Sequence, residues 1–315
     1  MFNGKQFLSL VSQYSKIAVF RHIHPDYDAL GSQQAVISFI QHRFPEKEVL
    51  SGGKDESLDP KFIPNPVTID PEWLNNALMI VVDASTYDRI DYKGAWEQAK
   101  EHLFIDHHQS KMPAADPHYL IKEGASSCCE ILTELFKEAN DDKPLETETA
   151  SYLYAGLIAD SLRFSINTTT QKTLEMGSYL LGSGLDVNKL NNQVFSVQLD
   201  LYRFSNYLRS IADYSDPKCV TCIVKTNDYA KFGIDANEAK TKVSIFGEIA
   251  GIKVWGLFVE EEKDKYSASL RSHTLNVRQI AEKFGGGGHN CACGISTLTL
   301  EQCEQVIKEL KELVA

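Results

Sequence analysis

The sequence offers little positive charge to a polyanion. Its 32 lysine and arginine residues are outnumbered by 43 aspartate and glutamate residues, and the formal net charge is −11. A protein that holds long nucleic acid needs a basic surface that neutralises many phosphates. The charge balance therefore argues against binding of long duplexes, and it leaves room for a small anionic substrate that meets cations locally.

Long apolar runs are missing as well. No stretch reaches the ~18 consecutive apolar residues of a membrane span, and the first twenty residues lack the basic segment, apolar run and small-residue cleavage site of a secretion signal. The seven cysteines are an odd number in a chain of 315 residues, which favours a reducing compartment over a disulfide framework. We therefore expect a cytoplasmic protein with no membrane partner.

Two common cofactor motifs are absent too. Cys219 and Cys222 form a single CxxC within the strand-like stretch "KCVTCIVK", and no second pair lies at zinc-finger spacing. The turn after the first apolar run reads "HIHPDYDALGS", which contains no GxGxxG and so excludes a dinucleotide-binding oxidoreductase. Any catalytic chemistry therefore has to come from the histidines and acidic residues.

Strand-like and helical segments alternate in the first half of the chain. The runs "KIAVF" (16–20), "ALMIVVD" (77–83) and "HLFID" (102–106) resemble buried strands, and segments with helical periodicity lie between and after them. This alternation predicts an α/β fold with a mainly parallel sheet flanked by helices. Ligands of such a sheet bind outside the carboxyl ends of the strands.

The second half has a different pattern. Residues 185–214 have mostly helical periodicity, and the last hundred residues contain four strand-like runs, a glycine run and a closing helix. We therefore predict a catalytic metal-binding domain at 1–185, a helical linker at 186–214 and a smaller α+β substrate-binding domain at 215–315. We expect the active site in the cleft between the domains, and the helical linker could support a homodimer.

Acidic residues and histidines stand at the ends of the predicted strands and at turns. Asp26 and Asp28 alternate along what we expect to be an extended turn, and Asp83 and Asp160 could converge with them. Two carboxylates 4 Å apart repel by roughly 4 kcal/mol at an effective dielectric of about 20, so such a cluster needs protons or cations. Each aspartate alone fits a helix cap or a turn, but "DHH" at 106–108, directly after a strand, makes that explanation insufficient. Carboxylate and imidazole ligands without thiolate favour Mn²⁺, and less well Mg²⁺ or Co²⁺.

These motifs, in their order and spacing, resemble those of the DHH phosphoesterase superfamily. The resemblance implies two Mn²⁺ ions, with Mg²⁺ or Co²⁺ as substitutes, and a water that attacks phosphorus between them. It assigns two ligand sets that share one residue: His22, Asp26 and Asp83 for the first ion, and Asp28, Asp83, His107 and Asp160 for the second. Asp83 and His108 are the implied catalytic residues, with His108 facing the scissile phosphate and Asp106 orienting the histidine.

The stretch "SLRSHTLNVRQIAEKFGGGGHNCACG" (269–294) resembles the substrate domain associated with DHH proteins. Glycines allow the backbone to approach an anion closely, and arginine and histidine supply charge-assisted hydrogen bonds, although a glycine run is more often a flexible turn. The implied substrate contacts here are Arg271, Gly286, Gly287, Gly288 and His289.

Two residues of the first half leave alternatives open. The segment "DSLRFSINTT" (160–169) resembles a family segment near the substrate, so Arg163 is either a phosphate contact or the partner of a neighbouring carboxylate. Tyr27 stands where relatives often have Gly or Pro, and it either narrows the pocket or stacks on a base.

Within the superfamily, the chain resembles the short nanoRNase or pAp phosphatase proteins and the similar phosphodiesterases that cleave pApA. It has no length for the extra domain of RecJ-type exonucleases, and it lacks the Ser-Arg-Lys-type motif of family II pyrophosphatases. We expect a Mn²⁺-dependent phosphodiesterase that hydrolyses short RNA and dinucleotides to nucleoside monophosphates and converts pAp to AMP. A cyclic di-AMP phosphodiesterase is the alternative, and a family II-like pyrophosphatase or an inactive nucleotide sensor is less favoured.

Overall fold

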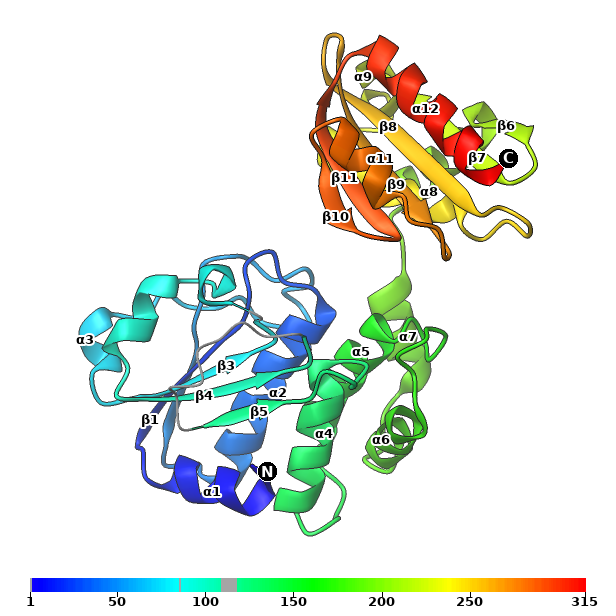
Figure 1. Ribbon diagram of the computed structural model, residues 1–315. Coiled ribbons are helices and arrows are strands. Elements are labelled where there is room, and N and C mark those ends of the chain that lie inside the picture. The colour runs from blue at the N-terminus through cyan, green and yellow to red at the C-terminus, as the bar shows by residue number, and fades with distance from the viewer. Residues whose placement is uncertain (1, 85, 109–117) are drawn as a thin grey trace. The chain divides into compact units, whose positions relative to one another are not determined.

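The computed structural model describes residues 2–84, 86–108 and 118–315. The chain divides into two compact units, Met1–Ser196 and Val197–Ala315 (Figure 1). Among the described residues, no helix is long and apolar enough to span a membrane.

The first unit is built on a five-stranded sheet with the spatial order β2-β1-β3-β4-β5. Its strands are β1 (Lys16–Phe20), β2 (Glu48–Ser51), β3 (Leu78–Val82), β4 (Glu101–Asp106) and β5 (Tyr119–Ile121). Each neighbouring pair of these strands is parallel, which confirms the predicted fold class. The strand order reverses between β1 and β3, and open parallel sheets bind ligands outside the carboxyl ends of the strands at such a point.

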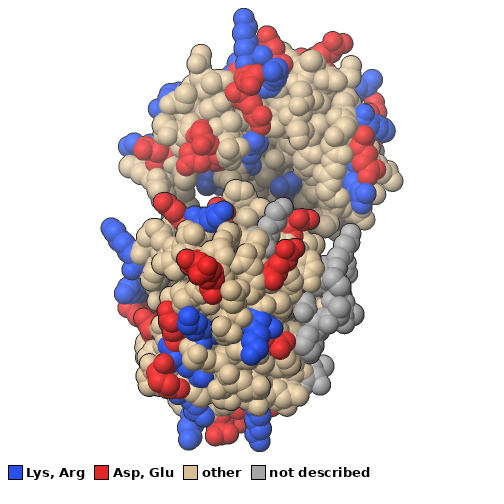
Figure 2. Space-filling model, turned by 90° about the vertical axis from the view of Figure 1, so that its left-hand side faces the viewer, with Lys and Arg blue, Asp and Glu red and all other residues tan. Residues whose placement is uncertain are grey.

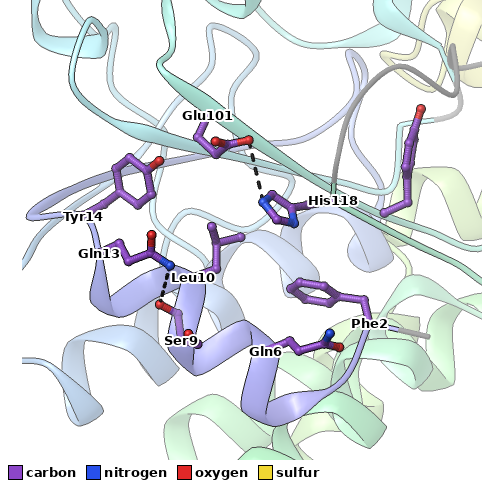
Figure 3. Close-up of a pocket in the computed structure, with 9 residues that line it drawn as sticks. Phe2, Gln6, Ser9, Leu10, Gln13, Tyr14, Glu101 and His118 are labelled. Atoms are coloured by element: carbon purple, nitrogen blue, oxygen red, sulfur yellow. Dashed lines mark hydrogen bonds and ion pairs between the residues drawn. The ribbon is translucent and has the colours of Figure 1, made fainter.

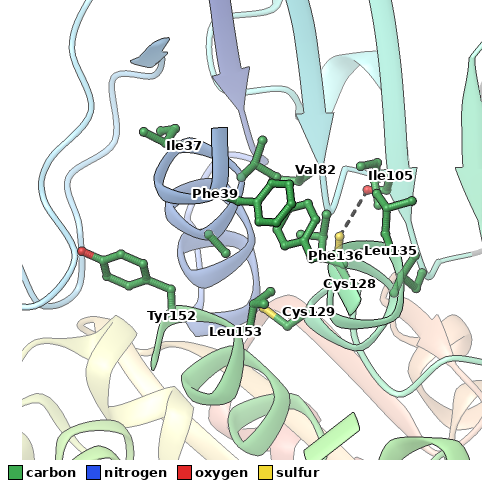
Figure 4. Close-up of a cluster of buried hydrophobic side chains, with 14 of the residues drawn as sticks. Ile37, Phe39, Val82, Ile105, Cys128, Cys129, Leu135, Phe136, Tyr152 and Leu153 are labelled. Carbon is green, nitrogen blue, oxygen red and sulfur yellow. Dashed lines mark hydrogen bonds between the residues drawn. The ribbon is translucent and has the colours of Figure 1, made fainter. Parts of the chain in front are cut away.

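Alternate residues of each strand pack into opposite layers. In β1, Ile17 and Val19 join one buried cluster, whereas Ala18 and Phe20 join another. The first cluster includes residues of α1 (Gly4–Ser12), α2 (Tyr27–Arg43), α4 (Cys128–Ala139) and α5 (Thr147–Asp160). Figure 4 shows part of it, in which the stacked rings of Phe39 and Phe136 join α2 to α4 with their centroids 4.1 Å apart.

Short helices and loops cover the other face of this sheet. They include α3 (Pro71–Leu74) and the 3-10 helices η1 (Tyr87–Arg89) and η2 (Lys93–Gln98). Two further helices, α6 (Gln171–Leu181) and α7 (Val187–Phe195), follow α5 and complete the unit.

The second unit contains a six-stranded mixed sheet with the spatial order β10-β11-β9-β8-β7-β6. Its strands are β6 (Asp213–Asp216), β7 (Cys219–Val224), β8 (Val254–Glu262), β9 (Lys265–Ser272), β10 (Gly287–His289) and β11 (Ala292–Leu298). The pair β7–β8 is parallel and the other neighbouring pairs are antiparallel. One face packs on α11 (Arg278–Lys283) and α12 (Leu300–Val314). The other packs on α8 (Leu199–Ile211), α9 (Thr226–Ala230), α10 (Ala236–Lys240) and η3 (Thr241–Phe246).

The stretch 186–214, predicted as a helical linker, is divided between the units. Helix α7 packs in the first unit through Leu190, and α8 packs in the second through Phe204 and Leu208. The last residues of the stretch also begin β6, where no strand was predicted. The domain limits at 185 and 215 stay a prediction.

Candidate metal centre

Acidic and histidine side chains of the first unit meet at the carboxyl ends of three neighbouring strands. His22 comes shortly after β1, Asp83 directly after β3 and His107 directly after β4, and Asp160 is the last residue of α5. Because β1, β3 and β4 are adjacent and parallel, their carboxyl ends lie side by side. The cluster therefore occupies the edge of the sheet where an α/β fold binds its ligand.

Asp83 is the centre of this cluster. Its carboxylate is buried, with Oδ2 3.4 Å from Nε2 of His22 and Oδ1 3.4 Å from Nε2 of His107. Its backbone is left-handed, with φ 53, and such a conformation costs of order 1–3 kcal/mol where the surrounding structure imposes it. The two oxygens of one carboxylate thus face two different histidines.

Each histidine belongs to a separate group of ligand atoms. Nε2 of His22 is 3.9 Å from Oδ2 of Asp26, and with Asp83 these residues form one group. Nε2 of His107 is 3.8 Å from Oδ2 of Asp28 and 3.5 Å from Oδ2 of Asp160, and these three residues form a second group. A third group contains His107 again, with Asp83, Asp106 and His108. The structure therefore brings the six predicted ligands together, and their role as ligands stays a prediction.

Three buried atoms in the cluster fit a metal centre. Oδ1 of Asp83, Nε2 of His107 and Oδ2 of Asp106 have no hydrogen-bond partner among the described residues. Buried polar atoms are nearly always hydrogen-bonded, so each of these atoms needs a partner. Aspartate oxygens and imidazole nitrogens without thiolate suit Mn²⁺, Mg²⁺ or Co²⁺, and the donor set thus fits two divalent cations.

The expectation of an extended turn at Asp26 and Asp28 is wrong. Asp26 caps the N-terminus of α2, where its Oδ1 accepts hydrogen bonds of 3.0 Å from the amides of Asp28 and Ala29. Asp28 lies in the first turn of that helix, and its oxygens accept the amides of Cys128 and Cys129 at 2.7 and 2.9 Å, at the start of α4. An aspartate before a helix is a preferred cap, and this local bond decides the conformation.

The charges of the cluster perturb one another. Burial, and next the charge of Asp83, raise the pKa of Asp28 to about 7. Burial, and next the charge of Asp28, raise the pKa of Asp160 to about 8. Burial acts to lower the pKa of His107, but the close carboxylate of Asp83 and the charges of Asp28 and Asp160 outweigh it and raise the pKa to about 10. Without metal, the cluster therefore holds protons that a divalent cation would displace.

Hydrogen bonds at the Nδ1 atoms of His22 and His108 orient these two side chains. Nδ1 of His22 lies 2.7 Å from the carbonyl oxygen of Ile23, which leaves Nε2 to face Asp83. Nδ1 of His108 lies 2.9 Å from Oδ1 of Asp106, and the same oxygen accepts the amides of His107 and His108. The His108 side chain is 40% exposed. Asp106 is therefore placed to orient a histidine that a substrate can reach.

Arg163 and Tyr27 both contact α7. Arg163 lies in a left-handed turn with φ 58, and its guanidinium stacks 3.7 Å from the ring centroid of Phe195. Among the described residues no carboxylate pairs with it, so the salt-bridge alternative for Arg163 is not observed. The hydroxyl of Tyr27 donates to the carbonyl oxygen of Gln193 at 3.1 Å, which directs this ring toward the same helix.

The glycine run of the second unit is not a flexible turn. Gly287, Gly288 and His289 form strand β10, which pairs with β11 at the edge of the sheet. A side chain at Gly286 would place its Cβ 2.3 Å from the carbonyl oxygen of Gly294, so only glycine fits there. Arg271 lies on β9 and donates to the carbonyl oxygens of its neighbour Leu270 and of Cys293 on β11 at 2.9 and 3.1 Å. These residues share one corner of the second sheet.

A cavity of about 630 Å³ lies at the opposite end of the first sheet. It is lined by α1, Tyr14 and the starts of β4 and β5, where Glu101 pairs with His118 at 3.7 Å (Figure 3). Because the strands are parallel, their amino ends lie away from the cluster at their carboxyl ends. The cavity therefore contains none of the predicted ligands.

Comparisons with known proteins agree with this arrangement. The model of the DHH family N-terminal domain matches residues 16–157, and that of the DHHA1 domain matches residues 216–315. The solved structure of an exopolyphosphatase-related protein from Bacteroides fragilis superposes on this chain with a TM-score of 0.83. The match covers 99% of this chain and 97% of that protein, at 21% sequence identity, and it shows a shared fold.

Two curated relatives of the same name match over nearly their whole length. The bifunctional oligoribonuclease and PAP phosphatase NrnA of Bacillus subtilis (strain 168) is 31% identical over 98% of this chain and 97% of that protein. The protein of the same name from Mycoplasma genitalium is 30% identical over 98% and 96%. The cyclic-di-AMP phosphodiesterase PdeA of Listeria monocytogenes is 25% identical over 94% of this chain but only 47% of its own length. The chain therefore belongs to the DHH family of metal-dependent phosphoesterases, with a DHH domain followed by a DHHA1 domain.

Proposed function

We propose that this protein hydrolyses short oligoribonucleotides and pApA-type dinucleotides to nucleoside monophosphates, and that it also converts pAp to AMP. The observation that supports this most directly is Asp83, whose two oxygens face two separate groups of ligand atoms. The substrate class follows from relatives that are named bifunctional oligoribonuclease and PAP phosphatase and that match over nearly their whole length.

The proposed ligands divide into two sets that share Asp83: His22, Asp26 and Asp83, and Asp28, Asp83, His107 and Asp160. Two divalent cations held by these ligands, Mn²⁺ in our proposal, would supply an acidic water for in-line attack and would neutralise charge on the phosphoryl oxygens. In the reaction, the water oxygen would form a bond to phosphorus and release a proton, the bond to the leaving oxygen would break, and that oxygen would take up a proton, so that protons balance.

Residues around the metals have positioning and binding roles in this proposal. Asp106 holds Nδ1 of His108, so that Nε2 is directed to a phosphoryl oxygen of the bound substrate. Arg271, His289 and the backbone of the glycine strand bind a phosphate of the substrate, because charged donors and close backbone amides suit an anion. Arg163, stacked on Phe195, is a further proposed phosphate contact.

The small-substrate proposal also suits the distribution of charge. On the face shown in Figure 2, basic and acidic side chains of the described residues are interspersed. Such a face does not offer a polyanion a continuous basic track, which long nucleic acid requires.

Product analysis tests the proposal. Metal-stripped protein is incubated, with and without Mn²⁺, with pApA, pAp, cyclic di-AMP, a 5′-phosphorylated RNA pentamer and pyrophosphate, and the products are separated by chromatography. We expect Mn²⁺-dependent AMP from pApA and pAp. Faster consumption of cyclic di-AMP than of pApA would instead favour the second candidate, to which the similarity with the Listeria phosphodiesterase points. Cleavage of pyrophosphate alone, or of nothing, would contradict the proposal.

A variant separates substrate binding from the chemical step. Arg271→Ala is expected to weaken binding of oligonucleotides while hydrolysis of bis-p-nitrophenyl phosphate falls much less, because the small diester has only the phosphate that is cleaved and lacks the further phosphate that Arg271 is proposed to bind. Equal losses on both substrates would count against that role of Arg271.

A further inference from the structure

The largest fully buried side chain in the described part of the protein is an arginine. Arg21 has 0% exposure and lies directly after β1 and directly before the proposed ligand His22. A buried guanidinium is costly unless it is paired and hydrogen-bonded. Neither the core of the unit nor the proposed chemistry accounts for its presence.

The contacts of Arg21 join three loops. Its Nη1 pairs with Oδ2 of the buried Asp91 at 2.9 Å and donates to the carbonyl oxygen of His22 at 3.2 Å, and its Nη2 donates to the carbonyl oxygen of Asp55 at 2.6 Å. The same oxygen of Asp91 accepts the amides of Lys54 and Asp55 at 2.8 and 2.9 Å. The ion pair thus ties together the loops that follow β1, β2 and β3.

These loops fix the backbone on both sides of His22. The amide of Asp91 donates to the carbonyl oxygen of Arg21 at 2.8 Å, and the amide of Ile23 donates to that of Arg89 at 2.7 Å. The carboxylate of Asp55 accepts the amide of the next residue along, His24, at 2.6 Å. With the backbone held in this way, the bond from Nδ1 of His22 to Ile23 directs Nε2 to Asp83.

The other proposed ligand group has different supports. Asp28 is held by the first amides of α4, and Nδ1 of His107 lies 3.3 Å from the carbonyl oxygen of Ala125. Asp160 is positioned as the last residue of α5. Among the described contacts of Arg21 and Asp91, none involves these ligands. The contacts that hold Asp28, His107 and Asp160 are therefore separate from those that hold His22, and Asp83 is the ligand that both groups share.

We infer that the buried Arg21–Asp91 pair positions His22, and that it sets the affinity of the first metal ion with little influence on the second. This inference rests on the proposed two-metal function. Arg21 acts through the backbone of His22 and is a positioning residue, since its described contacts include no ligand atom of the cluster and its side chain is fully buried.

Two variants separate positioning from charge. Arg21→Lys keeps the positive charge, but an ammonium group cannot reproduce the fork of guanidinium donors that reaches Asp91, His22 and Asp55 together. The double variant Arg21→Met, Asp91→Leu removes both charges and leaves no unpaired buried ion, a replacement that proteins often tolerate. Arg203→Lys is the matched control, because Arg203 pairs with Asp200 on the exposed surface of the second unit.

The experiment is a calorimetric titration of metal-free protein with Mn²⁺, with thermal unfolding of each variant recorded alongside. The wild type and Arg203→Lys are expected to bind two ions. In both Arg21 variants we expect one site to weaken about 10–100-fold, the effect typical of residues that orient metal ligands, while the other stays within about twofold of wild type.

The outcomes distinguish the inference from the function on which it rests. A wild type that binds fewer than two ions contradicts the proposed two-metal function, whatever the variants do. If the wild type binds two ions and the folded variants bind both with unchanged affinity, the inference alone is wrong. Equal weakening of both sites, or weakening that only follows a loss of folded protein, shows a general structural role and also overturns it.

Discussion

The position of the Asp83 carboxylate between two histidines predicts a large effect of substituting this residue. Asp83→Asn keeps the shape of the side chain, but it replaces one of the two oxygens by an amide nitrogen that cannot serve as a metal ligand and removes the negative charge, so the side chain can no longer be shared by two ions. We expect Mn²⁺-dependent turnover of pApA to fall at least about a hundredfold, since metal activation contributes several kcal/mol. Steady-state assays and a Mn²⁺ titration measure both effects.

Asp264→Asn is the matched control for that change. Asp264 has φ 59, close to the φ of 53 at Asp83, so both substitutions place asparagine in left-handed backbone. Asp264 is exposed and lies in the second unit, outside the cluster. Near-normal turnover in Asp83→Asn would rule out a shared ligand, and a loss in Asp264→Asn would show that the backbone conformation is responsible.

Gly156 controls how closely α5 approaches Asp28. A Cβ at Gly156 would lie 2.3 Å from Sγ of Cys129 and 3.0 Å from both Cα and Oδ1 of Asp28. Gly156→Ala is therefore expected to destabilise the protein by about 1–3 kcal/mol through overpacking and to weaken Mn²⁺ binding by displacing Asp28. Thermal unfolding and metal titration test this, with Gly124→Ala as control because its Cβ would meet nothing within 4 Å. An equal response of the two variants would contradict the role of close packing.

The residues of the cluster were predictable from the sequence, but their supports were not. Histidines and aspartates at strand ends, at a spacing that resembles a known family, indicate the six proposed ligands without a structure. Asp91 is 70 positions from Arg21, and nothing in the sequence around either residue indicates that they pair. Gly156 likewise has an ordinary place in a helical pattern, and its close approach to Asp28 follows from the packing of α5 against α2.

The turn after α5 contains strain that a glycine would relieve. Leu162, Arg163 and Phe164 are all left-handed, with φ of 45, 58 and 64, and this conformation costs an L-residue roughly 1–2 kcal/mol. Leu162 is 56% exposed and contributes little to the core. We therefore expect Leu162→Gly to raise the free energy of unfolding by about 0.5–1 kcal/mol, because the relief of strain exceeds the entropy that glycine loses.

Leu174→Gly is the control for the turn. Leu174 is 54% exposed, but it lies inside α6, where glycine costs about 1 kcal/mol relative to good helix formers. Chemical denaturation should show opposite signs for the two variants. A loss of stability in both would mean that the turn is not strained. Activity of Leu162→Gly then reports whether the strain is needed to place Asp160 and Arg163.

Strands with long apolar runs were predictable, whereas short exposed ones were not. β1, β3 and β4 read as apolar stretches that end in polar turns, and each was predicted. β5 has three residues, and β6 has the sequence Asp-Tyr-Ser-Asp with mostly exposed side chains, so neither shows the apolar alternation that marks a strand. The glycine strand β10 was not predicted as a strand, since glycine disfavours strands unless another backbone lies close.

The two-unit organisation follows from a change of pattern along the chain. Alternating strands and helices predicted the parallel sheet of the first unit, and clustered strands predicted a smaller α+β domain, which the structure shows to contain a mixed sheet. The assignment of the connecting helices was beyond the sequence, because α7 and α8 have similar amphipathic patterns and only their contacts show that they belong to different units.

Protonation of the cluster gives the metal-free protein a distinctive dependence on pH. Asp28 and Asp160 have folded-state pKa values of about 7 and about 8, above the ordinary value of 3.8. At pH values between 3.8 and these raised pKa values, the folded protein holds protons that the unfolded chain has released. The free energy of unfolding therefore falls as pH rises through this range. His107 adds to this, because its pKa of about 10 lies above the ordinary 6.5, and its contribution is complete below pH 6.5 and lost as pH rises toward 10.

We therefore expect the unfolding temperature of the chelator-treated protein to be a few degrees lower at pH 9 than at pH 6. Each kcal/mol lost from the free energy of unfolding lowers that temperature by about 2–4 °C. Mn²⁺ should reduce or reverse this difference, because the metal takes the place of the displaced protons and binds more tightly as pH rises. Thermal unfolding at the two pH values, with chelator and with Mn²⁺, measures both effects. The variant Asp160→Asn is the control, since it removes one of the groups and should flatten the metal-free dependence. An unfolding temperature that is equal or higher at pH 9 without metal would show that the cluster does not retain these protons.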